Sequence, residues 1–313
     1  MIGPLVTHDP SSSQLILRTG AAQTRVVTEA NQVILEVAMP LLAGPDFEVI
    51  ASGTDFSRHG RLHLLHGPGM IAGVGLADPG LPPREAARSL YSALLEQLEG
   101  HHLHRVWNYL PEINREVDGI ENYRAFNTGR YEAFSHSFGQ DFQPRLPAAS
   151  AVGTVGGSLA LAFLAGSGPT RHFENPEQVP SVEYPSDYGL VPPAFARGTV
   201  VEGAAGLSWF LSGTSSIKGH ATLGSEIEEQ ARLTFDNVQI MFRLMGLPEE
   251  GAVSWKIFLR HARDLPAARR AFETAFPSFA GEAMFVQADI CRSGLLLEVE
   301  ATCHAPLAAV LRS

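Results

Sequence analysis

Residues 288–303 read Ala-Asp-Ile-Cys-Arg-Ser-Gly-Leu-Leu-Leu-Glu-Val-Glu-Ala-Thr-Cys, and the apolar run after Gly294 is typical of a strand. Glu298 and Glu300 interrupt that run. In a strand they point to one face while Val299 points to the other. Two adjacent carboxylates among leucines do not both ionise at low cost, so one of them is expected to keep its proton near neutral pH and to serve as a general acid. The alternative is an ordinary half-exposed strand with an acidic face.

An internal repeat favours a functional role for these acids. Residues 150–163 align without a gap with residues 287–300, and in that alignment Leu161 and Phe163 match the acidic pair. Each aligned segment closes one half of the chain, and both halves follow the same order of predicted strands and helices. Because one copy carries an apolar pair where the other carries two acids, the fold itself does not require the acids.

Hydrophobic periodicity, prolines and glycines define the predicted elements. The triplets Gly67-Pro68-Gly69 and Gly73-Val74-Gly75 are predicted turns that open no helix, which argues against a dinucleotide-binding fingerprint. Helices are predicted at residues 83–98, 122–138, 225–245 and 265–276. Strands are predicted at residues 14–18, 25–27, 32–38, 47–50, 62–65, 105–110, 158–164, 206–211 and 255–259, and in the acidic segment.

The pattern predicts an α+β protein with a domain at residues 1–165, a connector at 166–198 and a second domain at 199–313. The connector is rich in proline and poor in helix-forming residues. It is too long and too aromatic for a plain flexible linker, so we expect it to be ordered over the surface or near a pocket. A disordered tether is the alternative.

Composition limits the partners of the chain. Its 313 residues carry a net charge of −10 with no cluster of basic residues, which argues against nucleic acid or an anionic membrane as a partner. No apolar window approaches the ~18 residues of a membrane span, and the N-terminus does not resemble a signal peptide. The two cysteines, Cys291 and Cys303, are too far apart on one extended segment to form a disulfide, which fits a cytoplasmic protein.

The second half resembles the YjgF/RidA family over residues 212–214, 229–238 and 297–301, and the first half resembles a degenerate copy. This resemblance implies two domains, each a mixed sheet backed by two helices, and an assembly that is usually trimeric. The family's arginine, which grips the substrate carboxylate in imine deaminases, is replaced in the two copies by Ala149 and Val286. That replacement argues against imine deamination.

A closer resemblance, to the chorismatases, covers about residues 100–300. It is carried by five motifs in the same order. They are Arg-Val-Trp-Asn-Tyr-Leu-Pro-Glu-Ile-Asn at 105–114, Asn-Tyr-Arg-Ala-Phe-Asn-Thr-Gly-Arg at 122–130, Phe-Glu-Asn-Pro-Glu-Gln-Val-Pro at 173–180, Ser-Gly-Thr-Ser-Ser-Ile-Lys-Gly-His at 212–220, and Cys-Arg at 291–292 followed by Leu-Glu-Val-Glu. The resemblance implies an enzyme that removes pyruvate from chorismate without a metal or organic cofactor.

The resemblance also implies roles for individual residues. Glu298, with Glu300 beside it, would protonate the enolpyruvyl methylene, and Cys291, seven residues earlier, would take part as in the subfamily that forms 3-hydroxybenzoate. Protonation of a vinyl ether at carbon needs an acid that is neutral at the working pH, and a dianionic substrate needs fixed cations. The predicted substrate-binding residues are Tyr123, Arg130, Arg145, Gly213, Thr214, Ser215 and Arg260.

Several alternatives stay open at this point. The product is 3-hydroxybenzoate, 4-hydroxybenzoate or a dihydroxycyclohexadiene carboxylate, and Ser215 lies in a loop whose small residue varies among subfamilies. The two alternative functions are those of a RidA-like imine hydrolase and of a non-catalytic protein that binds aromatic carboxylates. Both a homotrimer and a monomer are compatible with the duplication. The histidines at positions 63, 66, 101, 102 and 104 have no acidic or cysteine partner at ligand spacing, so no metal site is predicted.

Overall fold

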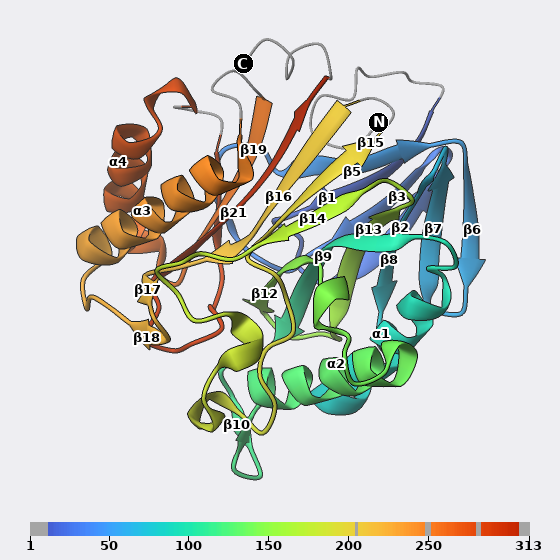
Figure 1. The fold of residues 1–313 in the computed structure, drawn as a ribbon, viewed down its shortest axis with the longest axis horizontal. Coiled ribbons are helices and arrows are strands. Elements are labelled where there is room, and N and C mark those ends of the chain that lie inside the picture. The colour runs from blue at the N-terminus through green and yellow to red at the C-terminus, as the bar shows by residue number, and fades with distance from the viewer. Residues whose placement is uncertain (1–11, 204–205, 248–251, 280–282, 307–313) are drawn as a thin grey trace.

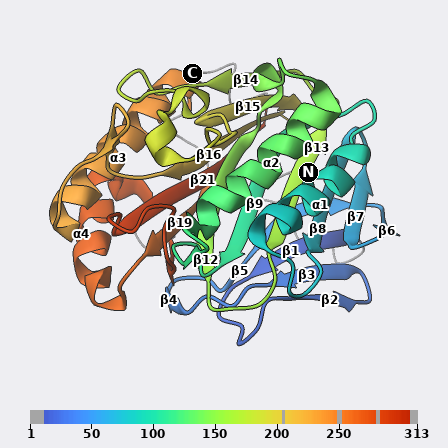
Figure 2. The same cartoon turned by 90° about the horizontal axis from the view of Figure 1, so that it is seen from below.

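The computed structural model describes residues 12–203, 206–247, 252–279 and 283–306, which form two large mixed sheets with helices on their outer faces (Figures 1 and 2). In the first large sheet, α1 (Pro83–Glu96) and α2 (Asn122–Phe138) pack on one face. Its strand order is β12 (Ala148–Thr154), β9 (His102–Pro111), β13 (Ala160–Gly166), β8 (Met70–Leu76), β7 (Leu62–Gly67) and β6 (Asp55–His59).

The second large sheet carries α3 (Ile227–Met245) and α4 (Leu265–Ala275) on its outer face. Its strand order is β14 (Thr170–Phe173), β15 (Gly198–Gly203), β16 (Gly206–Thr214), β21 (Leu297–Ala305), β19 (Ala252–Leu259), β20 (Met284–Gln287) and β4 (Leu41–Ala43). Apart from the added β4, this order repeats that of the first sheet when the first sheet is read from β6 to β12: β6, β7, β8, β13, β9 and β12 correspond to β14, β15, β16, β21, β19 and β20. The α+β class and the arrangement of a mixed sheet backed by two helices, present twice, are therefore confirmed.

The alignment of residues 150–163 with residues 287–300 is wrong: the two closing strands, β13 and β21, are displaced from their structural match by an odd number of residues. On β13, Leu161 and Phe163 point toward α1 and α2. On β21, Val299 and its alternate neighbours point toward α3 and α4, so Glu298 and Glu300 point to the opposite face. Side chains alternate along a strand, and an alignment that pairs residues of opposite faces cannot be structural. The residues of β13 on the face equivalent to the glutamates are Ala160, Ala162 and Leu164, which are also apolar.

A smaller sheet precedes the duplicated units. It has the order β2 (Arg25–Glu29), β3 (Gln32–Glu36), β1 (Ser13–Arg18) and β5 (Phe47–Gly53). Its buried aliphatic residues share one core with the inner faces of both large sheets, where β13 and β16 also contribute. All three sheets therefore enclose a common interior. The division of the chain into domains at residues 165 and 198 stays a prediction.

One predicted turn is a strand, and the connector is ordered. Gly73 and Gly75 lie within β8, where a Cβ on Gly73 would lie 2.9 Å from Leu64 Cδ2, so close packing rather than a turn explains the glycines. Within the connector, β14 joins the second large sheet and short 3₁₀ turns span Ser181–Glu183 and Ser186–Tyr188. Among the described residues, no helix is long and apolar enough to cross a membrane.

The contact between α1 and α2 gives a prediction for stability. A Cβ at Gly129 of α2 would overlap the carbonyl oxygen of Arg84 on α1 and lie 3.0 Å from the amide nitrogen of Arg88. Gly129→Ala should therefore force the helices apart and lower the free energy of unfolding by about 1–3 kcal/mol, the usual cost of overpacking. Urea denaturation measures this change.

Gly294→Ala is the matched control, because nothing lies within 4 Å of a Cβ at Gly294. Equal stability of the two variants would contradict the close packing of α1 on α2.

Candidate active site

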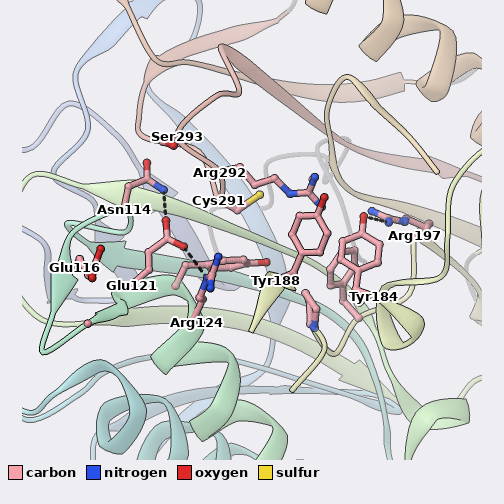
Figure 3. Close-up of a pocket in the computed structure, with 15 residues that line it drawn as sticks. Asn114, Glu116, Glu121, Arg124, Tyr184, Tyr188, Arg197, Cys291, Arg292 and Ser293 are labelled. Atoms are coloured by element: carbon pink, nitrogen blue, oxygen red, sulfur yellow. Dashed lines mark hydrogen bonds and ion pairs between the residues drawn. The ribbon is translucent and has the colours of Figure 1, made fainter. Parts of the chain in front are cut away.

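A cavity of about 630 Å³ opens where five segments of the chain meet (Figure 3). The segments are residues 114–121 with the hairpin of β10 (Glu116–Val117) and β11 (Ile120–Glu121), the first turn of α2, the connector from Tyr184 to Arg197, the end of β16, and the loop at 291–293. The connector therefore lies beside a pocket, as the sequence predicted. Both halves of the chain contribute to the cavity wall.

Glu298 lies directly behind this wall. A Cβ on Gly213, which lines the cavity, would lie 2.6 Å from Glu298 Cδ, so only glycine leaves room for the carboxyl group. Glu298 Oε2 is 3.9 Å from the sulfur of Cys291, another lining residue, while Oε1 has no hydrogen-bond partner. Burial, and secondly the charge of Glu300, raise the pKa of Glu298 to about 8. At neutral pH this carboxyl group holds its proton.

Glu300 has the opposite environment. Its Oε2 accepts hydrogen bonds from Ser150 Oγ at 2.5 Å and from Arg105 Nη2 at 2.7 Å, and its Oε1 lies 2.7 Å from Lys256 Nζ. Burial favours the neutral acid, but the cations Lys256 and Arg105 outweigh it and hold the pKa of Glu300 below its usual value. The acidic pair therefore consists of one neutral and one ionised carboxyl group.

Cys291 lies in the loop between β20 and β21. Burial, reinforced by the nearby Glu298, raises the pKa of its thiol to about 12. The group is therefore a neutral thiol at physiological pH, able to donate a weak hydrogen bond to Glu298 but not poised as a thiolate nucleophile.

Three arginines line the cavity, and none of them was among the residues predicted to bind substrate. Arg197 is buried and donates to Tyr184 Oη at 2.7 Å; the guanidinium of Arg292 lies over the Tyr188 ring at 4.1 Å. Arg124, at the start of α2, pairs with Glu121 at 3.6 Å. Figure 3 shows Arg197 and Arg292 on the side of the two tyrosines and Arg124 on the side of Glu121. Guanidinium groups suit the carboxylates of an anionic ligand.

The arginines predicted to bind substrate lie elsewhere. Arg260 donates to the carbonyls of Leu295, Ile290 and Arg292, to Asn114 and to Asp289, so it fixes the loop that carries Cys291. Arg130 is buried against the ring of Phe126 and donates to Asn127 at 2.8 Å. Arg145 packs over Phe138 at 4.8 Å and is not among the residues that line the cavity.

The remaining predicted residues are divided between the cavity and its support. Tyr123 and Gly213 line the cavity, and burial raises the pKa of the Tyr123 phenol. Thr214 and Ser215 are buried and donate to the backbone carbonyls of Ser212 and Leu297, so they stabilise the end of β16 and the start of β21. The structure thus brings Tyr123, Gly213, Cys291 and Glu298 together.

Several residues of the site were not predicted from the sequence, and they differ in how recognisable they are in it. Lys256 is a single lysine within an apolar strand, and Arg105 opens the first quoted motif, so each is recognisable as a buried charge in need of a partner. Arg124 and Arg292 lie within two of the quoted motifs, whereas Arg197 lies in none of them and follows no pattern that distinguishes it from a surface arginine. Among residues placed by the structure, no group of three or more His, Cys, Asp or Glu side chains is arranged to hold a metal ion.

Comparisons with known proteins identify the family. A family model described as chorismatase FkbO/Hyg5-like, N-terminal, matches residues 51–165. A 3-hydroxybenzoate synthase from Streptomyces hygroscopicus is 36% identical over 69% of this chain and 68% of that protein, and a chorismatase from the same organism is 29% identical over 95% and 87%. A crystal structure of a chorismatase matches with a TM-score of 0.84 at 27% identity, covering 96% of this chain and 95% of that one. The chain belongs to the chorismatase family.

The environment of Cys291 gives a prediction for thiol chemistry. Because the thiolate is the reactive form, a thiol pKa of about 12 should make alkylation by iodoacetamide at pH 8 slower by roughly a thousandfold than that of an ordinary cysteine. Peptide mass spectrometry over time measures the rate at this position. The same protein in urea provides the control, since both cysteines should then react quickly. Rapid labelling of Cys291 in the folded protein would contradict the neutral thiol.

Proposed function

We propose that this protein cleaves chorismate into a hydroxybenzoate and pyruvate, with Glu298 as the general acid that protonates the enolpyruvyl methylene carbon. The observation that carries the proposal is the buried Glu298 carboxyl group, with its free Oε1, against two residues of the cavity wall. Vinyl ethers are cleaved after protonation at carbon, which requires an acid that is still protonated at the working pH. A carboxyl group with a pKa of about 8 meets that requirement at neutral pH.

The charges around the cavity support a dianionic substrate. Arg197 and Arg292 offer guanidinium groups on one side of the cavity, and Tyr184 and Tyr188 lie next to them. Tyr123 also lines the cavity, with a neutral phenol that is able to donate a hydrogen bond. We propose that the arginines bind the two carboxylates and that Tyr123 orients a carboxylate or the ring hydroxyl.

The atoms balance without a co-reactant. Chorismate has the composition of hydroxybenzoate plus pyruvate, so the proton that Glu298 gives to the methylene is matched by one that the ring loses as it becomes aromatic. That second proton restores the acid form of Glu298. Release of the diene diol instead would consume one water. Of the hydroxybenzoates we favour the 3-isomer, because the relative that is 36% identical is named 3-hydroxybenzoate synthase and because Cys291 contacts the proposed acid.

Glu298→Gln tests the proposal. The amide keeps the shape of the side chain but has no acidic proton, so kcat should fall by on the order of 10²- to 10⁴-fold while chorismate still binds. Pyruvate release is followed with a coupled assay, the aromatic products are separated by chromatography, and binding is measured by calorimetry. Glu273→Gln, on the exposed side of α4, is the matched control and should leave turnover unchanged. A folded wild-type protein that leaves chorismate intact would refute the proposal.

The pH dependence of turnover offers a second test. Only the acid form of Glu298 donates a proton, so activity should be full below its pKa and fall as the pH rises through about 8. A pH profile of kcat measures this fall, the alkaline limb of the profile. Activity that instead increased through the same range would indicate that the carboxylate form of Glu298 is required, and Glu298 would then be a base.

A further inference from the structure

A chain of buried ions outside the cavity ends next to Glu298. Glu48 Oε1 lies 2.5 Å from Lys256 Nζ, and Lys256 Nζ lies 2.7 Å from Glu300 Oε1. Glu300 then binds Arg105 at 2.7 Å on its other oxygen. The Lys256, Glu300 and Arg105 side chains are each at most 4% exposed and that of Glu48 is 12% exposed, so water screens these charges little.

Each of the three sheets contributes to this chain. Glu48 belongs to β5 of the small N-terminal sheet, and Arg105 belongs to β9 of the first large sheet. Lys256 and Glu300 lie opposite each other on β19 and β21 of the second large sheet, where they are register partners. Ser254 Oγ, two residues before Lys256, donates to Glu48 Oε2 at 3.2 Å, so both oxygens of the Glu48 carboxylate contact β19.

We propose that Glu48 is a positioning residue for the reaction: through Lys256 it fixes the place of Glu300 beside Glu298 and balances the positive charge of the cations around Glu300. The inference rests on the proposed function, in which Glu298 gives up a proton. It assigns to the N-terminal sheet, which stands outside the duplicated units, a part in that chemistry.

The charge balance explains how Glu48 would act. Two carboxylates and two cations make the chain neutral overall, so Glu298 experiences the nearby charge of Glu300 without a net positive cluster behind it. Glu48→Gln would leave the cluster with one excess positive charge. A positive charge favours the carboxylate form of Glu298, and the proposed acid would lose its proton at a lower pH.

The other groups that face the two glutamates do not replace Glu48. Arg105 and Arg197 favour ionisation of Glu298, and Cys291 shares a weak hydrogen bond with it. Around Glu300 the remaining groups are the hydroxyl of Ser150 and the phenol of Tyr109, both neutral. Among the described groups that act on Lys256, Glu48 is the only carboxylate besides Glu300. Its removal is therefore not compensated locally.

The test compares Glu48→Gln with Glu36→Gln. Glu36 is a carboxylate of the same small sheet, but it pairs with Arg18 and Arg25 at the protein surface. We expect the alkaline limb of chorismate cleavage to move to lower pH by about 0.5–1 pH unit in Glu48→Gln and to stay in place in Glu36→Gln. Glu48→Asp keeps the charge but shortens the side chain, and it should give an intermediate shift; it also serves if the glutamine variant does not fold.

Infrared spectroscopy provides a readout that does not depend on turnover. The C=O stretching band of the protonated Glu298 carboxyl group is assigned as the band that is absent from Glu298→Gln. This band is then titrated with pH in the wild type and in both Glu48 variants. A midpoint that moves to lower pH in the Glu48 variants supports the inference even if chorismate proves not to be the substrate. An unchanged midpoint together with an unchanged limb overturns it, because a merely structural Glu48 would change stability or kcat uniformly with pH.

Discussion

The rest of this structure is arranged around the two ion pairs that the Glu300 carboxylate forms with Lys256 and Arg105. A buried ion of either sign is costly unless it is paired and hydrogen-bonded, so the strands that carry these three residues must approach each other in one register. That requirement brings β9 of one large sheet against β19 and β21 of the other. The cavity lies at the end of the same contact, so the pairing that closes the interior also determines where the two halves meet around a ligand.

The same interaction separates the roles of two chemically identical side chains. Glu298 and Glu300 are two residues apart on one face of one strand, yet only Glu300 meets cations at hydrogen-bond distance. Glu298 meets Gly213, a thiol and a second acid, so it keeps its proton. A pair of carboxylates whose pKa values are driven apart by their surroundings is a recurring arrangement in acid catalysis. Here the arrangement needs no special backbone conformation, only different neighbours for alternate residues of a strand.

The sequence predicted the elements better than the contacts between them. The four helices, the duplication and the unequal acids on the last strand follow from periodicity and from local spacing. The alignment placed Leu161 at the position of Glu298, but the two side chains point to opposite faces of their sheets. The alignment is displaced by an odd number of residues, and side chains alternate between the faces of a strand. Arg260 was expected to bind substrate but holds a loop, and Arg197 was missed, because the partner of an arginine comes from segments that only the tertiary fold brings together.

The proposed mechanism has Glu298 deliver a proton to the methylene carbon of chorismate during the step that limits cleavage. Its most direct test is the rate of cleavage in H₂O and in D₂O, with the deuterium content of the pyruvate measured by mass spectrometry at early times. We expect slower cleavage in D₂O and pyruvate that carries one deuterium in its methyl group, with both signals lost when Glu298 is glutamine. Equal rates in the two solvents, or full activity of Glu298→Gln, would contradict it.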